Sequence, residues 1–198
     1  MIEDIIKNGI SPNDILLLLD YPTKQKYNAH VMHSSHLMPI NWWHGVAAIL
    51  PTDYVALLCD DLTLKPESLR TLLQYAQEHQ EASVFGFEGG NFAKTDNPYT
   101  DAMSHTTDKY ESAEYLIRFY FAKPEAYARA LVLHHKLPEE LRGHDDMTLS
   151  LANSCGLIPT TDECGWNELS EHDIAYSSRT THYYERNKLV RKVRTGRI

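Results

Sequence analysis

The chain has 198 residues, of which 42% are hydrophobic and 23% are charged, and its formal net charge is -8 at pH 7. These values fit one globular domain and exclude a general attraction to nucleic acid or to an anionic membrane. The longest apolar runs, such as 15–19 and 54–59, are too short to cross a bilayer. The N-terminus lacks the basic and apolar segments of a signal peptide, so we expect a cytoplasmic protein without a membrane span.

The predicted elements alternate between helices and strands. The N-terminal part is predicted to form a helix over 2–8 ended by Gly9, a strand over 15–19 and a weak strand within 27–38. A helix over 41–50, a strand over 54–59, a helix over 66–76 and a strand over 82–87 follow. After a surface loop over 91–108 come a strand over 115–121, a helix over 124–135 and a helix over 145–154 closed by Gly156. This alternation predicts a single α/β domain over 1–198, with a mostly parallel central sheet flanked by helices.

The cysteines and histidines give little support for a zinc site. Cys59, Cys155 and Cys164 are an odd number without CxxC spacing, which argues against a disulfide scaffold and a thiolate site. The three histidines at positions 30, 33 and 36 recur at a constant interval, but in a strand or loop that spacing places them on no common face. Isolated histidines are more often structural or exposed.

The strongest chemical signal is a pair of carboxylates at the end of the apolar strand 54–59. Asp60 and Asp61 follow this strand directly, and open α/β sheets bind ligands beyond the carboxyl ends of their strands. Two carboxylates there suit Mg²⁺ or Mn²⁺, which prefer oxygen ligands and bridge to phosphates. A turn or a helix N-cap explains the pair about equally well.

A second acidic pair, Asp145 and Asp146, opens the helix predicted over 145–154. Acids in a first helical turn interact favourably with the helix dipole, and this is the simpler explanation of the pair. The functional interpretation is a carboxylate that holds a sugar hydroxyl or accepts its proton.

The C-terminal segment 182–198 is basic. It contains Arg186, Lys188 and four further cations with no acid between 186 and 197, so it is either a solvated helix or a phosphate-binding surface. His182 and Arg186 are four residues apart, which places them on one face of a helix.

Two other local patterns allow a role at a ligand. The pair Gly89-Gly90 is either a simple turn or a place where the backbone approaches a substrate closely. Trp42 and Trp43 face different directions on a helix, so one is expected in the core and the other is free to stack on a base or sugar.

Taken in order, these motifs resemble glycosyltransferases of the GT-A fold, in particular their exostosin-like and family 2-like branches. Segment 52–62 resembles their DxD region. Segment 144–150 resembles a Glu-Asp element whose carboxylate lies beside the donor sugar, and 182–186 resembles a late His-x-x-x-Arg element in which a histidine completes the metal or diphosphate site. The helix that begins at Pro66 and the later Gly89-Gly90 fit the same order.

The sequence departs from the family pattern in three places. Cys59 stands where a complete DxD has an acid, and 41–44 reads Asn-Trp-Trp-His where relatives often carry an arginine. The strand that normally precedes the family's first helix, and whose following loop holds the nucleobase, has no evident counterpart.

The resemblance implies a transferase that moves a sugar from a nucleotide-sugar donor to an acceptor hydroxyl. It places Mn²⁺ or Mg²⁺ on Asp60, Asp61 and His182. It assigns binding of the donor diphosphate to Arg186, Lys188 and the Gly89-Gly90 pair. The catalytic carboxylates are Asp146 and Asp145.

Two alternatives and several details stay open. One alternative is a metal-dependent hydrolase that uses histidines and carboxylates around zinc, and the other is a non-catalytic nucleotide-sugar or carbohydrate binding module. The sequence fixes neither the donor, the stereochemical outcome nor the acceptor, which is a glycan, a small molecule or a modified DNA base.

Overall fold

The computed structural model describes residues 2–7, 9–19, 25–33, 41–58, 62–168 and 181–196. Helices and strands intermix throughout these ranges, so the expectation of an α/β protein is confirmed. Among these residues, no helix combines the length and the apolar character that crossing a membrane requires.

The N-terminal elements follow the sequence prediction closely. Helix α1 (Ile2–Lys7) comes before Gly9, whose φ of +89° is the left-handed conformation that ends a helix. After a 3-10 turn at Pro12–Asp14, strand β1 (Leu16–Leu19) pairs in parallel with β2 (His30–His33). Helix α2 (Trp42–Ile49) lies within the range predicted for it.

A five-stranded sheet forms the centre of the molecule. Its spatial order is β3 (Val55–Leu58), β9 (Phe119–Ala122), β5 (Val84–Gly86), β10 (Cys155–Leu157) and β7 (Glu111–Ala113). Only the β5–β10 pair is parallel, and the other three pairings are antiparallel. The prediction of a mostly parallel sheet is therefore wrong for this sheet, because β9 returns between β3 and β5 in the opposite direction.

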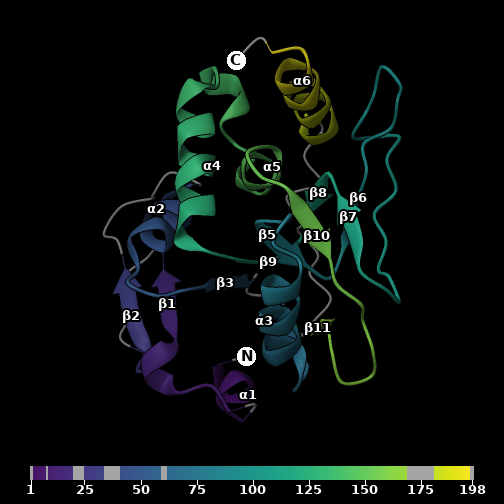
Figure 1. Cartoon of the computed structure of the whole chain (residues 1–198). Coiled ribbons are helices and arrows are strands. Elements are labelled where there is room, and N and C mark those ends of the chain that lie inside the picture. The colour runs from purple at the N-terminus through teal and green to yellow at the C-terminus, as the bar shows by residue number, and fades with distance from the viewer. Residues whose placement is uncertain are drawn as a thin grey trace.

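Side-chain alternation along β9 gives the sheet two apolar faces. Tyr120 and Ala122 pack into one core with helices α2, α4 (Pro124–Lys136) and α5 (Asp145–Leu151). Phe119 and Phe121 pack into a second core on which α3 (Ser68–Glu78) lies. The helices consequently cover both faces of the sheet (Figure 1).

The strand expected over 115–121 is interrupted in the structure. Arg118 has a φ of 68°, and this unusual conformation separates β8 (Tyr115–Leu116) from β9. Strand β8 pairs with β6 (Gly89–Gly90), while β4 (Leu62–Leu64) pairs with β11 (Trp166–Glu168). The prediction that Gly156 closes the helix over 145–154 is also wrong. Helix α5 already ends at Leu151, and Gly156 lies inside β10.

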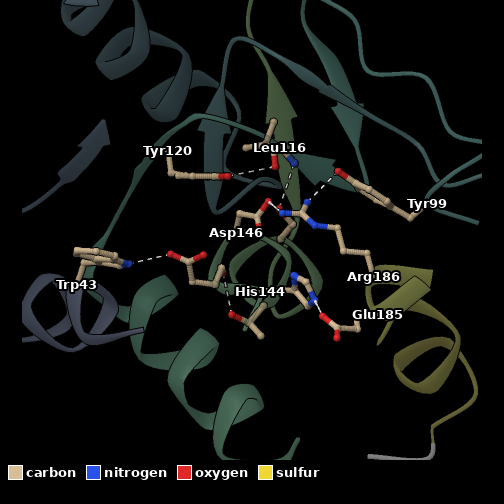
Figure 2. Close-up of polar contacts among 11 residues, drawn as sticks. Trp43, Tyr99, Leu116, Tyr120, His144, Asp146, Glu185 and Arg186 are labelled. Atoms are coloured by element: carbon tan, nitrogen blue, oxygen red, sulfur yellow. Dashed lines mark hydrogen bonds and ion pairs between the residues drawn. The ribbon is translucent and has the colours of Figure 1, made fainter. Parts of the chain in front are cut away.

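The C-terminal helix α6 (His182–Arg194) completes a third core. Its residues Leu189 and Val190 are fully buried against Met147 of α5 and Leu141 of the 3-10 turn Glu139–Leu141. This packing sets the first turn of α6 beside the first turn of α5, where the candidate site lies (Figure 2).

Candidate functional site

The starts of α5 and α6 meet in a buried ion pair. Arg186 Nη2 lies 2.6 Å from Asp146 Oδ2, and only 9% of the arginine side chain and 18% of the aspartate side chain are exposed. His182, one turn earlier on α6, is also buried, so the one-face arrangement of His182 and Arg186 is as predicted. The structure thus brings together three residues selected from the sequence. Asp146 and Arg186 form the ion pair (Figure 2), and His182 interacts electrostatically with both of them.

Tyr99 forms the opposite wall for the guanidinium. Arg186 Nη1 donates a hydrogen bond of 2.8 Å to the Tyr99 hydroxyl. Burial is the largest single influence and opposes the charge of Arg186, but Asp146 together with Tyr99 and Tyr120 outweighs it, so the pKa of the arginine lies above its ordinary value. Burial also raises the pKa of Tyr99. The site therefore contains a fixed, desolvated positive charge between a carboxylate and a phenol.

Two imidazoles lie next to this ion pair. His144 Nε2 is 3.1 Å from Glu185 Oε2, and the His144 and His182 rings meet edge to face with 5.9 Å between centroids. Burial and the Arg186 charge lower the pKa of both histidines, that of His182 to about 4. Both rings are accordingly neutral at neutral pH, which is the form of imidazole that binds a metal.

The second carboxylate of the α5 start is held from another element. Trp43 of α2 donates its indole N–H to Asp145 Oδ2 at 2.8 Å, across 102 positions of sequence. Burial and the adjacent Asp146 raise the pKa of Asp145, while the indole hydrogen bond opposes the rise. Trp43 therefore contributes a hydrogen-bond donor, whereas the sequence pattern suggested only a core or stacking role.

The loop that carries Tyr99 is fastened to α6. Asn187 Oδ1 accepts hydrogen bonds from the backbone N–H groups of Tyr99 and Thr100 at 2.8 and 3.2 Å. Arg191 donates to the Asp96 carbonyl at 2.6 Å, and Arg194 pairs with the Glu114 carboxylate. Arg191 thus connects α6 to the loop that carries Tyr99, and Arg194 connects it to the residue before β8.

Not every predicted site residue joins the cluster. Lys188 points to Glu140, with 3.0 Å between Nζ and Oε1, on the side of α6 that faces the 3-10 turn. Asp60 and Asp61 lie outside the described residues, between the end of β3 at Leu58 and the start of β4 at Leu62.

The Gly89-Gly90 pair has a packing explanation. A Cβ added at Gly89 meets the Tyr115 carbonyl oxygen at 2.1 Å, and one added at Gly90 meets the Met103 carbonyl oxygen at 2.7 Å. Both glycines are thus required for close contact between backbone segments, which was neither of the two explanations drawn from the sequence.

Sequence reasoning missed Tyr99, Glu185 and Asn187, and it gave His144 no role. Tyr99 lies in a polar segment without periodicity, and its contact with Arg186 spans 87 positions. Asn187 is a buried polar residue in the basic segment 182–198, and no pattern in the neighbouring sequence indicates that it is buried. His144 and Glu185 could have been found from the sequence, because they lie inside the motifs 144–150 and 182–186.

Metal binding within the described residues falls short of a complete site. No group of three or more His, Cys, Asp or Glu side chains there is arranged to hold a metal ion. His182 is the one predicted metal ligand in the described part of the chain. Comparison with known proteins adds no relationship: no protein-family model matches the sequence, and no curated protein is significantly similar to it.

Proposed function

We propose that the chain is a GT-A-like glycosyltransferase that moves a sugar from a nucleotide-sugar to an acceptor hydroxyl with the help of a divalent cation. The observation that supports this most is the 2.6 Å contact between Arg186 and Asp146. It joins two segments, 40 positions apart, to which the family resemblance independently gives the donor diphosphate and the donor sugar.

Unused hydrogen-bonding capacity in this ion pair supports the same proposal. Asp146 Oδ1 and Arg186 Nε are buried and have no hydrogen-bond partner among the described residues. A guanidinium has five N–H donors, and the contacts with Asp146 and Tyr99 account for two of them. Buried polar atoms without partners are rare in folded proteins. A sugar hydroxyl would donate to Asp146 Oδ1, and a phosphate oxygen would accept from Arg186 Nε–H.

The cation would be Mn²⁺ or Mg²⁺, held by Asp60, Asp61 and His182. The donor set fits such an ion, because two carboxylates supply oxygen and the His182 imidazole is buried and neutral. When bound there, such a cation would supply positive charge to offset the negative charge of a departing diphosphate. Arg186 adds fixed positive charge to the same oxygens, and Asp146 holds the sugar or accepts the proton of the acceptor hydroxyl.

Thermal unfolding in the presence of nucleotide-sugars tests the proposal. We expect UDP-glucose or a related donor to raise the melting temperature with Mn²⁺ or Mg²⁺ and not in EDTA, because a ligand that binds only the folded state stabilises it. His182→Ala should raise the Mn²⁺ concentration needed for this effect, and His105→Ala, which removes an exposed histidine, should not.

Each alternative has a distinct outcome in the same experiments. Equal stabilisation in EDTA contradicts the role of the metal. Saturable donor binding without turnover on a broad acceptor panel indicates a binding module. Stoichiometric zinc in the purified protein, bound by histidines, indicates a hydrolase.

A further inference from the structure

The two adjacent carboxylates at the start of α5 are held by chemically different donors. Asp146 pairs with the Arg186 guanidinium from α6, and Asp145 accepts the neutral indole N–H of Trp43 from α2 (Figure 2). Both contacts are made by elements far away in sequence, so the tertiary structure sets them independently. Neighbouring carboxylates in unlike environments commonly divide the roles of acid–base group and charged group between them.

The guanidinium of Arg186 contacts Oδ2 of Asp146 and stabilises its negative charge. Asp146 is therefore suited to accept a hydrogen bond from a sugar hydroxyl at Oδ1. Within the described ranges the side-chain partner found for Asp145 is the neutral indole of Trp43. This donor can stay bonded whether or not the carboxylate later takes a proton on its other oxygen. Burial and the neighbouring Asp146 raise the pKa of Asp145 toward the range in which an enzyme base operates.

Several other titratable or charged groups surround the carboxylate pair. His44 of α2 is buried and interacts electrostatically with Asp146 and with His134 of α4. From α6, Arg186 and His182 interact with Asp146, and His144 does so from the residue before α5. None of these groups lies between Trp43 and the Asp145 oxygen to which it donates.

We propose that Asp145 accepts the proton of the acceptor hydroxyl and that Trp43 is the positioning residue that fixes the Asp145 carboxylate. This inference rests on the proposed glycosyl transfer. In that step the acceptor oxygen bonds to the anomeric carbon, and the bond from that carbon to the diphosphate oxygen breaks. The electron pair leaves with the nucleoside diphosphate, and the hydroxyl proton passes to Asp145.

A test without substrate uses the indole N–H resonances. The chain has three tryptophans, so a ¹H–¹⁵N spectrum shows three indole signals, and Trp43→Phe identifies one of them by its loss. We expect the Trp43 signal to move with pH, with a midpoint above the ordinary range of an aspartate. Asp145→Asn should abolish this movement. A Trp43 signal that does not move, or that still moves in Asp145→Asn because His44 titrates, overturns the assignment.

A second test compares two adjacent tryptophans. Trp43→Phe keeps an aromatic ring and removes the donor, while Trp42→Phe is the matched control because the buried Trp42 Nε1 has no partner among the described residues. In Trp43→Phe we expect kcat to fall by about tenfold to a hundredfold with little change in donor KM. The midpoint of the acid limb in the pH profile of kcat should move to a higher pH by about one unit, because the lost hydrogen bond favoured the carboxylate form of Asp145.

The outcomes separate the inference from the proposed function. If no donor binds and no turnover occurs, the glycosyltransferase proposal fails while the indole titration still reports on the Trp43–Asp145 pair. If turnover occurs and Trp43→Phe behaves like Trp42→Phe in both kcat and pH profile, Trp43 has no positioning role.

Discussion

Arg186 and Asp146 connect the first turns of α6 and α5 through a contact of 2.6 Å, and the Tyr99 hydroxyl accepts a second bond from the same guanidinium. The pair is desolvated on most sides. Removing one member of such a pair costs more than the pair itself contributes, because the other charge stays buried. The same two residues are therefore expected to affect both stability and donor handling.

A double-mutant cycle on this pair separates the two effects. We expect Asp146→Asn and Arg186→Met each to lower the free energy of unfolding by about 2 kcal/mol. In the double variant the combined loss should fall short of the sum by about 1 kcal/mol or more, since the residues are in contact. Turnover per folded molecule should drop at least about a hundredfold in Asp146→Asn. Urea denaturation and steady-state kinetics measure both, and unchanged activity per folded molecule assigns Asp146 a purely structural role.

Asn187 is expected to stabilise the part of the loop around Tyr99. Asn187→Ala leaves the Tyr99 and Thr100 backbone N–H groups without their acceptor, so we expect a loss of about 2–4 kcal/mol of unfolding free energy. Hydrogen exchange at these two amides should accelerate. Lys188→Ala is the control on the next residue, because its ion pair with Glu140 is exposed and should leave stability nearly unchanged. Slow exchange at Tyr99 in the Asn187 variant contradicts this role.

His44 should make stability depend on pH. Its pKa is lowered from 6.5 to about 4, chiefly by burial and then by His134, so the folded state keeps it neutral while the unfolded chain takes up a proton. As pH falls from 6.5 toward 4, wild type should lose up to about 1.4 kcal/mol per pH unit relative to His44→Gln. Asp145, whose pKa is raised, contributes in the opposite direction in both proteins. His135→Gln removes an exposed histidine as control, and parallel curves for wild type and His44→Gln contradict the prediction.

Two glycine-to-alanine substitutions should change the free energy of unfolding in opposite directions. Gly89→Ala places a Cβ 2.1 Å from the Tyr115 carbonyl oxygen and should lower the free energy of unfolding by about 2 kcal/mol or more, since backbone must move. Gly45→Ala lies in α2, where nothing is within 4 Å of the new Cβ, and should raise it by about 0.5–1 kcal/mol. Chemical denaturation of both variants measures the difference. A harmless Gly89→Ala shows that β6 and β8 separate easily.

The sequence by itself determined the elements whose signals are local. Helix α3 follows from apolar residues at helical spacing, and α4 from that spacing and a proline in its first turn. The shared side of His182 and Arg186 follows from the period of one helix. These features depend on neighbours within a turn or two, and so they can be read without knowing where the chain goes next.

The tertiary structure decided the direction of β9, the break at Arg118 and the partners of the site residues. Periodicity shows which side of a strand is apolar, but Phe119 and Phe121 give the same pattern in a parallel and an antiparallel strand. The contacts of Arg186 with Tyr99 and of Asp145 with Trp43 span 87 and 102 positions. Such contacts form only when the three apolar cores pack. The packing of apolar faces brings these polar groups to hydrogen-bond distance, and no local conformational preference does so.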